Sequence, residues 1–243
     1  MKKKIILMLT IIMSVCFITG CGSKKEETKA RQSALDFKKE YEDINGKTAK
    51  GDMKYRSLDI KDNNPYVKVT PKEIVEKINN KETFYLYVGD PLCPWCRSGL
   101  EKMIEVANAE GIKDIYYIDF WDDNHKEILR DLYEVQTVNG ETKVVKTQSA
   151  TDEYKQILNA VESFAQDYTL TKDGKEYDTG KKRIMGGDHF YFENGVAKKY
   201  VSLRSAKLKN AFDELTEEVL KDQEKNFTEF FTNGDVCTGE DNC

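Results

Sequence analysis

The sequence predicts an α/β fold with a mainly parallel sheet, in the order βαβαβ, an insert, then ββα. Three observations lead to this prediction. Phe84–Val88 is a continuous apolar run, which is typical of a strand buried on both faces. Helical patterns precede and follow this run with short connections, an order that favours parallel strands with right-handed crossovers. Further along the chain, Asn194-Gly195 separates two β-rich runs and is a strong hairpin signal.

The elements next to this buried strand have their own local signals. Tyr66–Val69 is a short strand pattern, and the four residues from Thr70 to Glu73 have the form of a capping box with proline at the first helical position. A second helix is predicted after residue 93, with a stop at Gly111. Its apolar residues recur at helical spacing: Leu100, Met103, Ile104 and Ala107. Ile115–Phe120 is then the next predicted strand.

Residues 121–186 are predicted to form a helical insert before the hairpin. Two apolar patterns with helical spacing occur there, one at Ile128, Leu129, Leu132 and Tyr133, and one at Tyr154, Ile157, Leu158, Val161 and Phe164. Turn signals lie at Asn139-Gly140 and Asp173-Gly174. After the hairpin, a long helix is predicted to include Leu208 and Val219 and to end near residues 233–234.

The first 21 residues have the layout of an export signal. Lys2–Lys4 precede the apolar run Ile5–Ile18, which is too short to span a bilayer comfortably, and small residues lead to Cys21. This order resembles the lipobox of bacterial lipoproteins. The resemblance implies that residues 1–20 are removed and that Cys21 carries fatty acids such as palmitate. It also implies a protein anchored by lipid on the extracytoplasmic face of the cell membrane, in the Gram-positive manner. The alternative is an ordinary cleavage site with a cysteine beside it by chance.

The polar and charged residues 22–33 have no periodicity and predict a flexible tether. We therefore expect a tether and N-terminal extension over 21–57, a folded domain over 58–234 and a cysteine-containing tail over 235–243. One short helix is predicted within the extension, from the spacing of Ala34, Phe37 and Tyr41.

Composition narrows the possible functions. The 243 residues carry a formal net charge of −5 without a large basic patch, so a nucleic-acid partner is not expected. No Ser/His/Asp set, phosphate loop or metal-ligand cluster is evident, and neither a metal nor a cofactor is expected. An exported chain lies outside the reducing cytoplasm, in an environment in which disulfides persist. Besides Cys16 and Cys21, the cysteines form two local pairs, Cys93/Cys96 and Cys237/Cys243.

The spacing of Cys93-Pro94-Trp95-Cys96 fits three kinds of site: a working dithiol, a structural disulfide, or half of a zinc site completed by the C-terminal pair. Its position favours the dithiol. Cys93 falls at a strand-to-helix junction, where unpaired N–H groups and the helix dipole stabilise a thiolate. Pro94 suits the first helical position. Cys93 is thus the predicted nucleophile and Cys96 the resolving thiol. Trp95 is expected to offer an exposed apolar contact, and Arg97 either adds positive potential or is plain surface.

The segment YVGDPLCPWC, followed by an amphipathic helix and a βαβ partner, resembles the active-site segment of thioredoxin-like thiol-disulfide oxidoreductases. The Pro-aromatic pair is closest to that of the glutaredoxins. The resemblance covers residues 65–120 and 186–232. It implies a thioredoxin-like fold, exchange of disulfides with protein substrates through a redox disulfide between Cys93 and Cys96, and a further redox partner. The other class of function is a surface lipoprotein that uses this fold as a binding or accessory module without turnover.

The chain departs from that family at three places. The family has a buried acid six residues before the first cysteine, where this sequence has Tyr87; Asp90 is nearer. The family places a cis-proline opposite the motif, but all four prolines here precede residue 95, and Gly187 aligns with that spot as part of the active-site loop. The insert at 121–186 has no counterpart, and it either caps the site and selects substrates or extends the core.

Two further features each have two interpretations. Cys237 and Cys243 form a candidate structural disulfide, or they are a second dithiol that passes electrons to the first. His189 begins the strand next to the glycine loop, where it is a structural residue or a member of the site.

Overall fold

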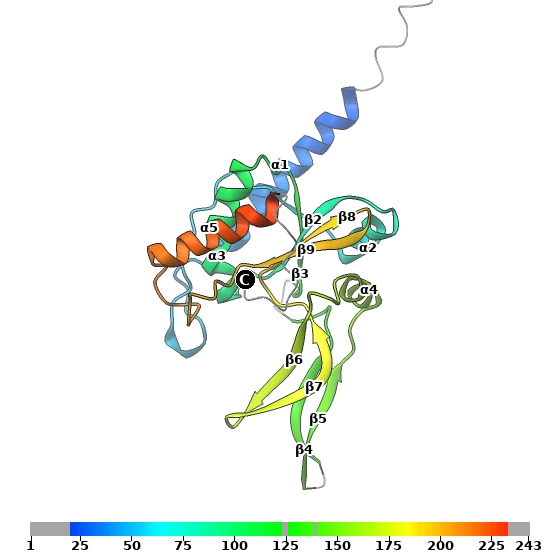
Figure 1. The fold of residues 1–243 in the computed structure, drawn as a ribbon, viewed down its shortest axis with the longest axis vertical. Helices are drawn as coiled ribbons and strands as arrows, with labels where there is room; N and C mark the ends of the chain where they lie inside the picture. The colour runs from blue at the N-terminus through cyan, green and yellow to red at the C-terminus, as the bar shows by residue number, and fades with distance from the viewer. Residues whose placement is uncertain (1–19, 123–125, 139, 233–243) are drawn as a thin grey trace, which may run out of the picture.

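A five-stranded mixed sheet with the strand order β1-β3-β2-β8-β9 forms the centre of the protein (Figure 1). The computed structural model describes residues 20–122, 126–138 and 140–232. Three strands run parallel, and two complete the sheet in antiparallel pairing. The parallel strands are β1 (Tyr66–Lys68), β3 (Ile115–Asp119) and β2 (Phe84–Gly89), and the antiparallel ones are β8 (Asp188–Glu193) and β9 (Val196–Ser202). The predicted α/β class is confirmed, and so are the five strands themselves, to within a residue or two at their ends.

Helices cover both faces of this sheet. One face packs against α1 (Gly20–Glu42), α3 (Pro94–Ala109) and α5 (Glu217–Phe231), and the other against α2 (Pro71–Asn79) and α4 (Asp152–Ala160). The sequence of strand β2 is apolar throughout because its side chains enter both cores. Tyr87 enters the first core, while Leu86 and Val88 enter the second. A strand that is buried on both faces has no polar side to alternate with, as the sequence predicted.

The predicted caps and turns form as their chemistry requires. The Thr70 side chain accepts a hydrogen bond from Glu73 N at 3.2 Å, and the Glu73 carboxylate accepts one from Thr70 N at 2.7 Å, which completes the capping box of α2. In the β8–β9 hairpin, Asn194 and Gly195 both have positive φ, at 51° and 74°. A Cβ on Gly195 would also overlap the Ile78 carbonyl, so this turn requires glycine.

The prediction of a helical insert over 121–186 is wrong. Only its second pattern forms a helix, α4, and the rest is mainly two antiparallel hairpins: β4 (Leu132–Val138) with β5 (Glu141–Gln148), and β6 (Gln166–Lys172) with β7 (Lys175–Arg183). The strands are rich in valine, threonine and tyrosine, whose β-propensity prevails over the helical spacing of four apolar residues. The predicted turn signal Asp173-Gly174 lies at the tip of the β6–β7 hairpin, and Gly140 of the other signal lies directly before β5.

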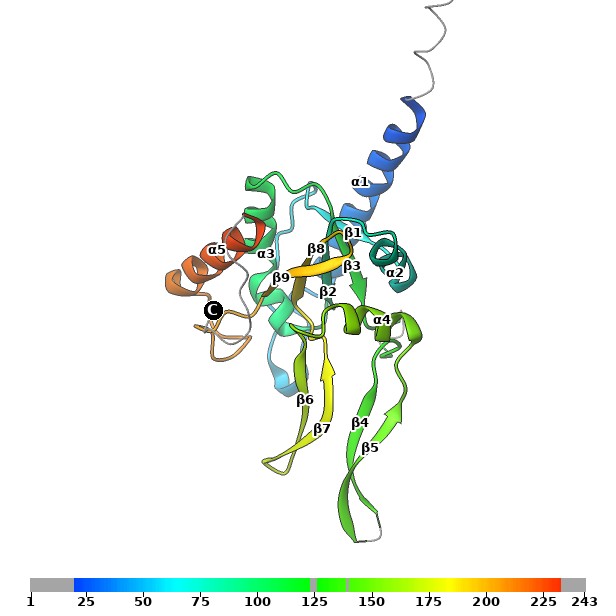
Figure 2. The ribbon, with the colours of Figure 1, turned by 45° about the vertical axis from the view of Figure 1, so that its right-hand side comes forward.

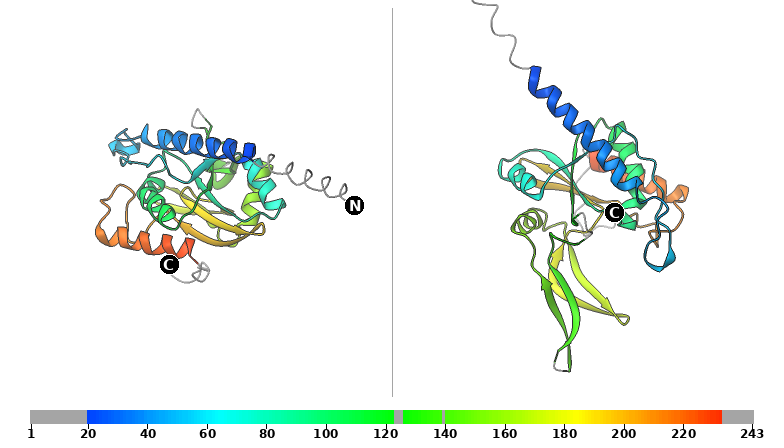
Figure 3. Two further views of the ribbon diagram at one scale, coloured as in Figure 1. Left: turned by 90° about the horizontal axis from the view of Figure 1, so that it is seen from above. Right: turned by 180° about the vertical axis from the view of Figure 1, so that it is seen from behind.

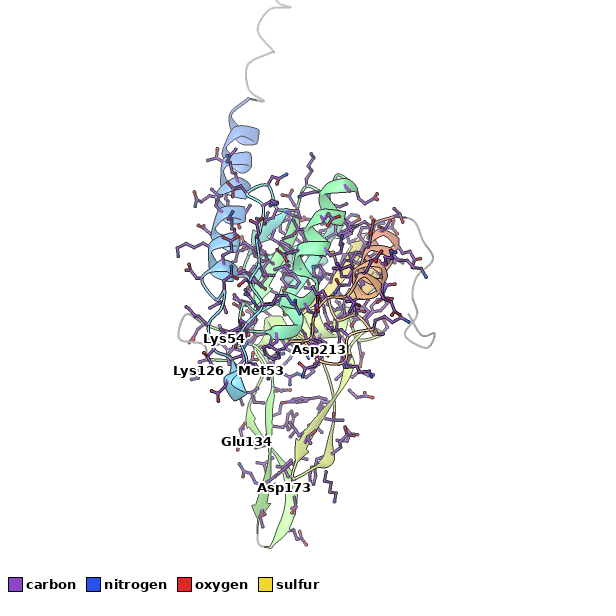
Figure 4. All side chains as sticks on the ribbon, turned by 90° about the vertical axis from the view of Figure 1, so that its left-hand side faces the viewer. Met53, Lys54, Lys126, Glu134, Asp173 and Asp213 are labelled. Carbon is purple, nitrogen blue, oxygen red and sulfur yellow. The ribbon has the colours of Figure 1, made fainter. Side chains whose placement is uncertain are left out.

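Both hairpins project from one end of the domain (Figure 2). Glu134 and Asp173 lie along them, beyond the end of the domain where Met53 and Lys54 lie (Figure 4). The hairpins touch each other through the rings of Tyr133 and Tyr168, whose centroids are 5.6 Å apart.

The helix predicted from Leu208 begins later, at Glu217. The side chain of Asn210 accepts a hydrogen bond from Phe212 N at 3.0 Å, and Asp213 accepts one from Asn210 N at 3.0 Å. Such local bonds hold the backbone in turns and compete with a helix. Thr216 then caps α5 by accepting from Val219 N. The predicted end of this helix near residues 233–234 lies outside the described residues.

The predicted flexible tether over 22–33 is also wrong, because α1 is continuous from Gly20 to Glu42. Ala34, Phe37 and Tyr41 form a buried stripe on this helix, and Phe37 and Tyr41 belong to the same core as Tyr87. The folded domain therefore begins well before residue 58. The N-terminal half of α1 extends beyond the sheet (Figure 3). No helix in the described part of the chain is long and apolar enough to cross a membrane.

Arg97 joins this N-terminal segment to the rest of the domain. The side chain is only 1% exposed, and its hydrogen-bond acceptors are all uncharged oxygens. They are Arg56 O at 2.6 and 2.8 Å, Tyr41 O at 2.8 Å, Pro91 O at 3.2 Å and Asn45 Oδ1 at 2.6 Å. The segment that it holds includes the short 3₁₀-helix η1 (Lys50–Asp52). Arg97 is thus an internal anchor and not the surface residue that one interpretation allowed.

The substitution Arg97→Met should lower the free energy of unfolding by about 3 kcal/mol, because several buried carbonyl groups lose their donor. Urea denaturation followed by circular dichroism measures this change. Arg31→Met, which removes an exposed arginine from α1, should change stability by less than about 0.5 kcal/mol. Equal effects of the two substitutions would contradict the anchoring role.

Candidate functional site

Cys93 lies at the N-cap of α3, directly after the loop that follows β2. Its Sγ accepts a hydrogen bond from the backbone N–H of Cys96 at 3.1 Å, and Pro94 occupies the first helical position. Cys93 is partly exposed, whereas Cys96 has no exposed surface. The two cysteines are therefore adjacent but unequal: solvent reaches the first sulfur, and the second lies in the core.

The surroundings of Cys96 determine when it ionises. Burial raises the pKa of the Cys96 thiol well above its usual value, and the neighbouring Cys93 sulfur raises it further. Hydrogen bonds from the backbone of Asp90 and from the Tyr87 hydroxyl lower this pKa in part. The buried Cys96 thiol therefore stays protonated unless its surroundings change.

Tyr87 lies at the position where the family that the motif resembles has a buried acid. It has no exposed surface, and a Cβ on Gly89 would overlap its hydroxyl, so the phenol ring lies beneath that glycine. The hydroxyl oxygens of Tyr41 and Tyr87 are 2.8 Å apart. Burial raises the pKa of both phenols well above the usual value, so both are neutral. When Tyr41 donates to Tyr87, the Tyr87 proton is free to hydrogen-bond the Cys96 sulfur.

Two carboxyl groups lie where the parallel strands end. Asp90 is 9% exposed and accepts a hydrogen bond from Leu92 N at 2.8 Å. Asp119 pairs in register with Gly89 and accepts hydrogen bonds from the Tyr117 hydroxyl at 3.2 Å and from Trp121 N at 3.0 Å. Burial, and next the charge of Asp90, raise the pKa of Asp119 to about 7. Sequence analysis missed Asp119, although an acid at the carboxyl end of the strand beside the motif is a recognisable signal.

A glycine loop faces the two sulfurs. A Cβ on Gly186 would lie 3.2 Å from Cys93 Sγ and 3.3 Å from Cys96 Sγ, so this backbone touches both cysteines. Gly187 has a φ of 104°, and its N–H donates to Val88 O at 2.9 Å. Gly187, the residue predicted for this loop, attaches the loop to β2, and Gly186 before it makes the closer contact with the two sulfurs. The described residues contain no cis peptide bond.

His189 supports this loop from within the core. Its ring nitrogens lie 2.9 Å from the Tyr66 hydroxyl and 3.2 Å from Gly187 O, and its ring stacks on Tyr87 at 4.4 Å between centroids. Burial lowers the pKa of His189 to about 3, so the imidazole is neutral. Its position agrees with the structural interpretation.

Trp95 is partly exposed, two residues after Cys93, as expected. The guanidinium carbon of Arg204 lies 4.4 Å from the centre of its ring, a cation–π contact that the sequence did not predict. Met185, 38% exposed, lies next to Gly186 in the glycine loop. Trp95 and Met185 are thus partly exposed apolar side chains close in sequence to Cys93 and to Gly186, respectively.

The other predicted cysteines are placed only in part by the structure. Cys21 lies in the first turn of α1, and Cys237 and Cys243 lie outside the described residues. Among the residues that the structure describes, no group of three or more His, Cys, Asp or Glu side chains could hold a metal ion.

No family model, curated protein or solved structure matches this chain.

Asp188 holds the glycine loop at its far end. It has no exposed surface, and it accepts hydrogen bonds from Met185 N at 2.8 Å and from the Tyr200 hydroxyl at 3.0 Å. Burial raises the pKa of Asp188 to about 7 despite these bonds. The folded protein therefore binds this proton more tightly than the unfolded chain does.

Because the pKa of Asp188 is raised on folding, its contribution to stability is complete below about pH 4 and is lost as the pH rises to about 7. The free energy of unfolding of the wild type, minus that of Asp188→Asn, should fall by a few kcal/mol, on the order of 1.4 per pKa unit, across this window. Urea denaturation at a series of pH values measures the difference. Asp119 and His189, which also titrate, are present in both proteins.

The control Asp173→Asn removes an exposed carboxylate from the tip of the β6–β7 hairpin and should follow the wild type at every pH. A pH-independent difference between wild type and Asp188→Asn would contradict the assignment.

Proposed function

We propose that this protein is a thiol-disulfide oxidoreductase with a thioredoxin-like fold that exchanges disulfides with protein substrates. One observation carries the proposal: a partly exposed Cys93 Sγ accepts the Cys96 N–H at the start of a helix, while Cys96 itself is buried. A thiolate is stabilised at such a position, and a second thiol three residues on can resolve what the first one binds. The sheet order and the helices on both faces are what this fold class requires, and they add support.

The exchange proceeds in two steps. The Cys93 thiolate attacks one sulfur of a substrate disulfide, forming a mixed disulfide and releasing the other sulfur as a thiolate. The Cys96 thiolate then attacks Cys93 Sγ, forming the Cys93–Cys96 disulfide and releasing the first substrate sulfur. Two electrons pass to the substrate, whose thiolates take up protons. A separate dithiol protein or small thiol returns the two electrons; in the reverse direction, a substrate dithiol is oxidised.

Resolution requires Cys96 to lose its proton in the core. The Tyr87 hydroxyl is a neutral donor and stabilises the thiolate without accepting the proton. Asp119, with a pKa of about 7, supplies a carboxyl group that exchanges protons near neutral pH at the same end of the sheet. In this scheme the Tyr87 phenol stabilises the thiolate and the Asp119 carboxylate accepts the proton, two roles that a single buried acid would otherwise fill.

We place the protein on the extracytoplasmic face of the membrane, held by fatty acids on Cys21. In α1, the buried Ala34 lies thirteen positions after Cys21, and residues 28–33 before it are exposed or partly exposed. At 1.5 Å per residue, this stretch spans roughly 20 Å. The helix is then a spacer that holds the domain away from the lipid surface.

Replacing Cys96 with Ala should trap substrates as mixed disulfides, because Cys93 can still attack but nothing can resolve the product. Non-reducing gels of cells that express this variant should show additional bands that disappear on reduction. The matched control Cys93→Ser with Cys96→Ala should show none. The wild type should also reduce insulin in the presence of a thiol donor.

If Cys96→Ala traps nothing and the wild type does not reduce insulin, the oxidoreductase proposal fails. The binding or accessory module would then account better for the fold.

Tyr87→Phe should raise the pKa of the Cys96 thiol by up to about one unit and slow resolution at neutral pH by up to about tenfold. An aromatic disulfide reagent such as Ellman's reagent releases one chromophore when Cys93 reacts and a second when Cys96 resolves. Stopped-flow absorbance therefore separates the two steps. Only the second should slow, and its pH profile should move to higher pH.

Tyr66→Phe is the matched control, since it removes a buried hydroxyl from the same aromatic cluster whose partner is His189. It should leave the second phase unchanged. An identical second phase in Tyr87→Phe and in the wild type would exclude a role for this hydroxyl.

A further inference from the structure

The loop Ile184–Asp188 joins the insert to the sheet, and its centre lies against the dithiol. Gly186 is the contact, since a Cβ there would lie 3.2 Å from Cys93 Sγ and 3.3 Å from Cys96 Sγ. Two successive glycines, Gly186-Gly187, give this loop more conformational freedom than any other residue pair would. The loop contains no proline to restrict it. A defined position beside the sulfurs therefore needs restraints from outside the loop.

Part of that restraint comes from the insert. Arg130 Nη1 donates to Ile184 O at 3.3 Å, and the Tyr154 hydroxyl accepts from Ile184 N at 3.0 Å. Ile184 itself has no exposed surface. Both backbone polar groups of the residue that begins the loop are thus bonded to insert side chains.

Arg130 is in turn held rigidly. Glu127, only 4% exposed, accepts hydrogen bonds from Arg130 Nε at 2.7 Å and from Nη2. The guanidinium carbon also lies 3.6 Å from the centre of the Phe120 ring, at the end of β3. A planar guanidinium with two bonds to one carboxylate and one face on a ring has little freedom, so its remaining donor has a defined direction.

The sheet restrains the other end of the loop. Asp188 accepts from Met185 N, Gly187 N donates to Val88 O, and Leu203 N donates to Gly187 O at 3.0 Å. The loop is therefore held on the insert side and on the sheet side, with Gly186 between the two attachments.

We propose that Arg130 and Tyr154 are positioning residues for the dithiol, and that the insert braces the loop that borders the substrate in its mixed disulfide with Cys93. This inference rests on the proposed oxidoreductase function. A substrate sulfur bonded to Cys93 lies beside Gly186, so the chain that carries it passes over this loop. When the brace loosens, substrates bind less well, while the thiolate of Cys93, stabilised by the Cys96 N–H, keeps its reactivity.

Tyr154→Phe removes the acceptor for Ile184 N, and Arg130→Lys removes the donor for Ile184 O but keeps a positive charge for Glu127. Hydrogen–deuterium exchange of the Met185 and Gly187 amides, measured by NMR on the full chain, should be about 3- to 10-fold faster in each variant. The KM for a disulfide-bonded peptide should rise by a similar factor while kcat changes less. Alkylation of Cys93 by iodoacetamide should keep its rate and its pH profile.

Tyr168→Phe is the matched control: it removes a hydroxyl from the insert that has no hydrogen-bond partner among the described residues, and all three measurements should stay unchanged. Unchanged amide exchange in both Tyr154→Phe and Arg130→Lys would overturn the brace. Faster exchange with an unchanged KM would overturn its role in positioning substrate. Faster exchange in a chain whose wild type has no activity would support the brace and reject the oxidoreductase function.

Discussion

The domain is organised around a buried positive charge that has no carboxylate partner among the residues the structure describes. Arg97 lies one residue after Cys96, and its guanidinium bonds to oxygens of α1, of the segment after it and of the loop before Cys93. A guanidinium has five donors in a fixed plane, so it can join several carbonyl groups that have no other common neighbour. Burying such a charge is tolerable only when nearly every donor is occupied. The same residue therefore requires α1, the motif loop and the start of α3 to stay together.

Besides Arg97, hydroxyl and imidazole groups surround the buried sulfur of Cys96. Tyr87 fits because Gly89, two residues along the strand on the same face, has no side chain. Tyr41 and His189 then complete a cluster that is aromatic by area and polar at its tips. Such a cluster can donate hydrogen bonds to a thiolate, but it cannot accept a proton at neutral pH. In the proposed mechanism, proton acceptance is left to the carboxyl groups where β2 and β3 end.

The insert at 121–186 contributes side chains that contact the loop beside the two cysteines. Its hairpins leave the domain, but the residues that precede and separate them turn inward, where Glu127, Arg130 and Tyr154 meet the loop at Ile184. A glycine pair beside the dithiol gives close approach to the sulfurs, and it also costs more conformational entropy to order than other residues would. The inward side chains supply the hydrogen bonds that offset this cost.

The succession of the five sheet strands along the chain, the capping box at Thr70 and the place of Cys93 at a helix start were all predictable, because each depends on residues that are neighbours in the chain. The first insert hairpin was missed because four apolar residues at helical spacing outweighed a turn signal at residues 139–140. The length of α1 was missed because charged residues without periodicity form a helix only when its far end is packed. The hydrogen bonds of Arg97 to Tyr41, of Tyr41 to Tyr87 and of Arg130 to Ile184 join residues 46–56 positions apart in the chain. Such contacts exist only once the sheet has formed, so the sequence determined the dithiol and its helix, and the tertiary structure alone decided what surrounds them.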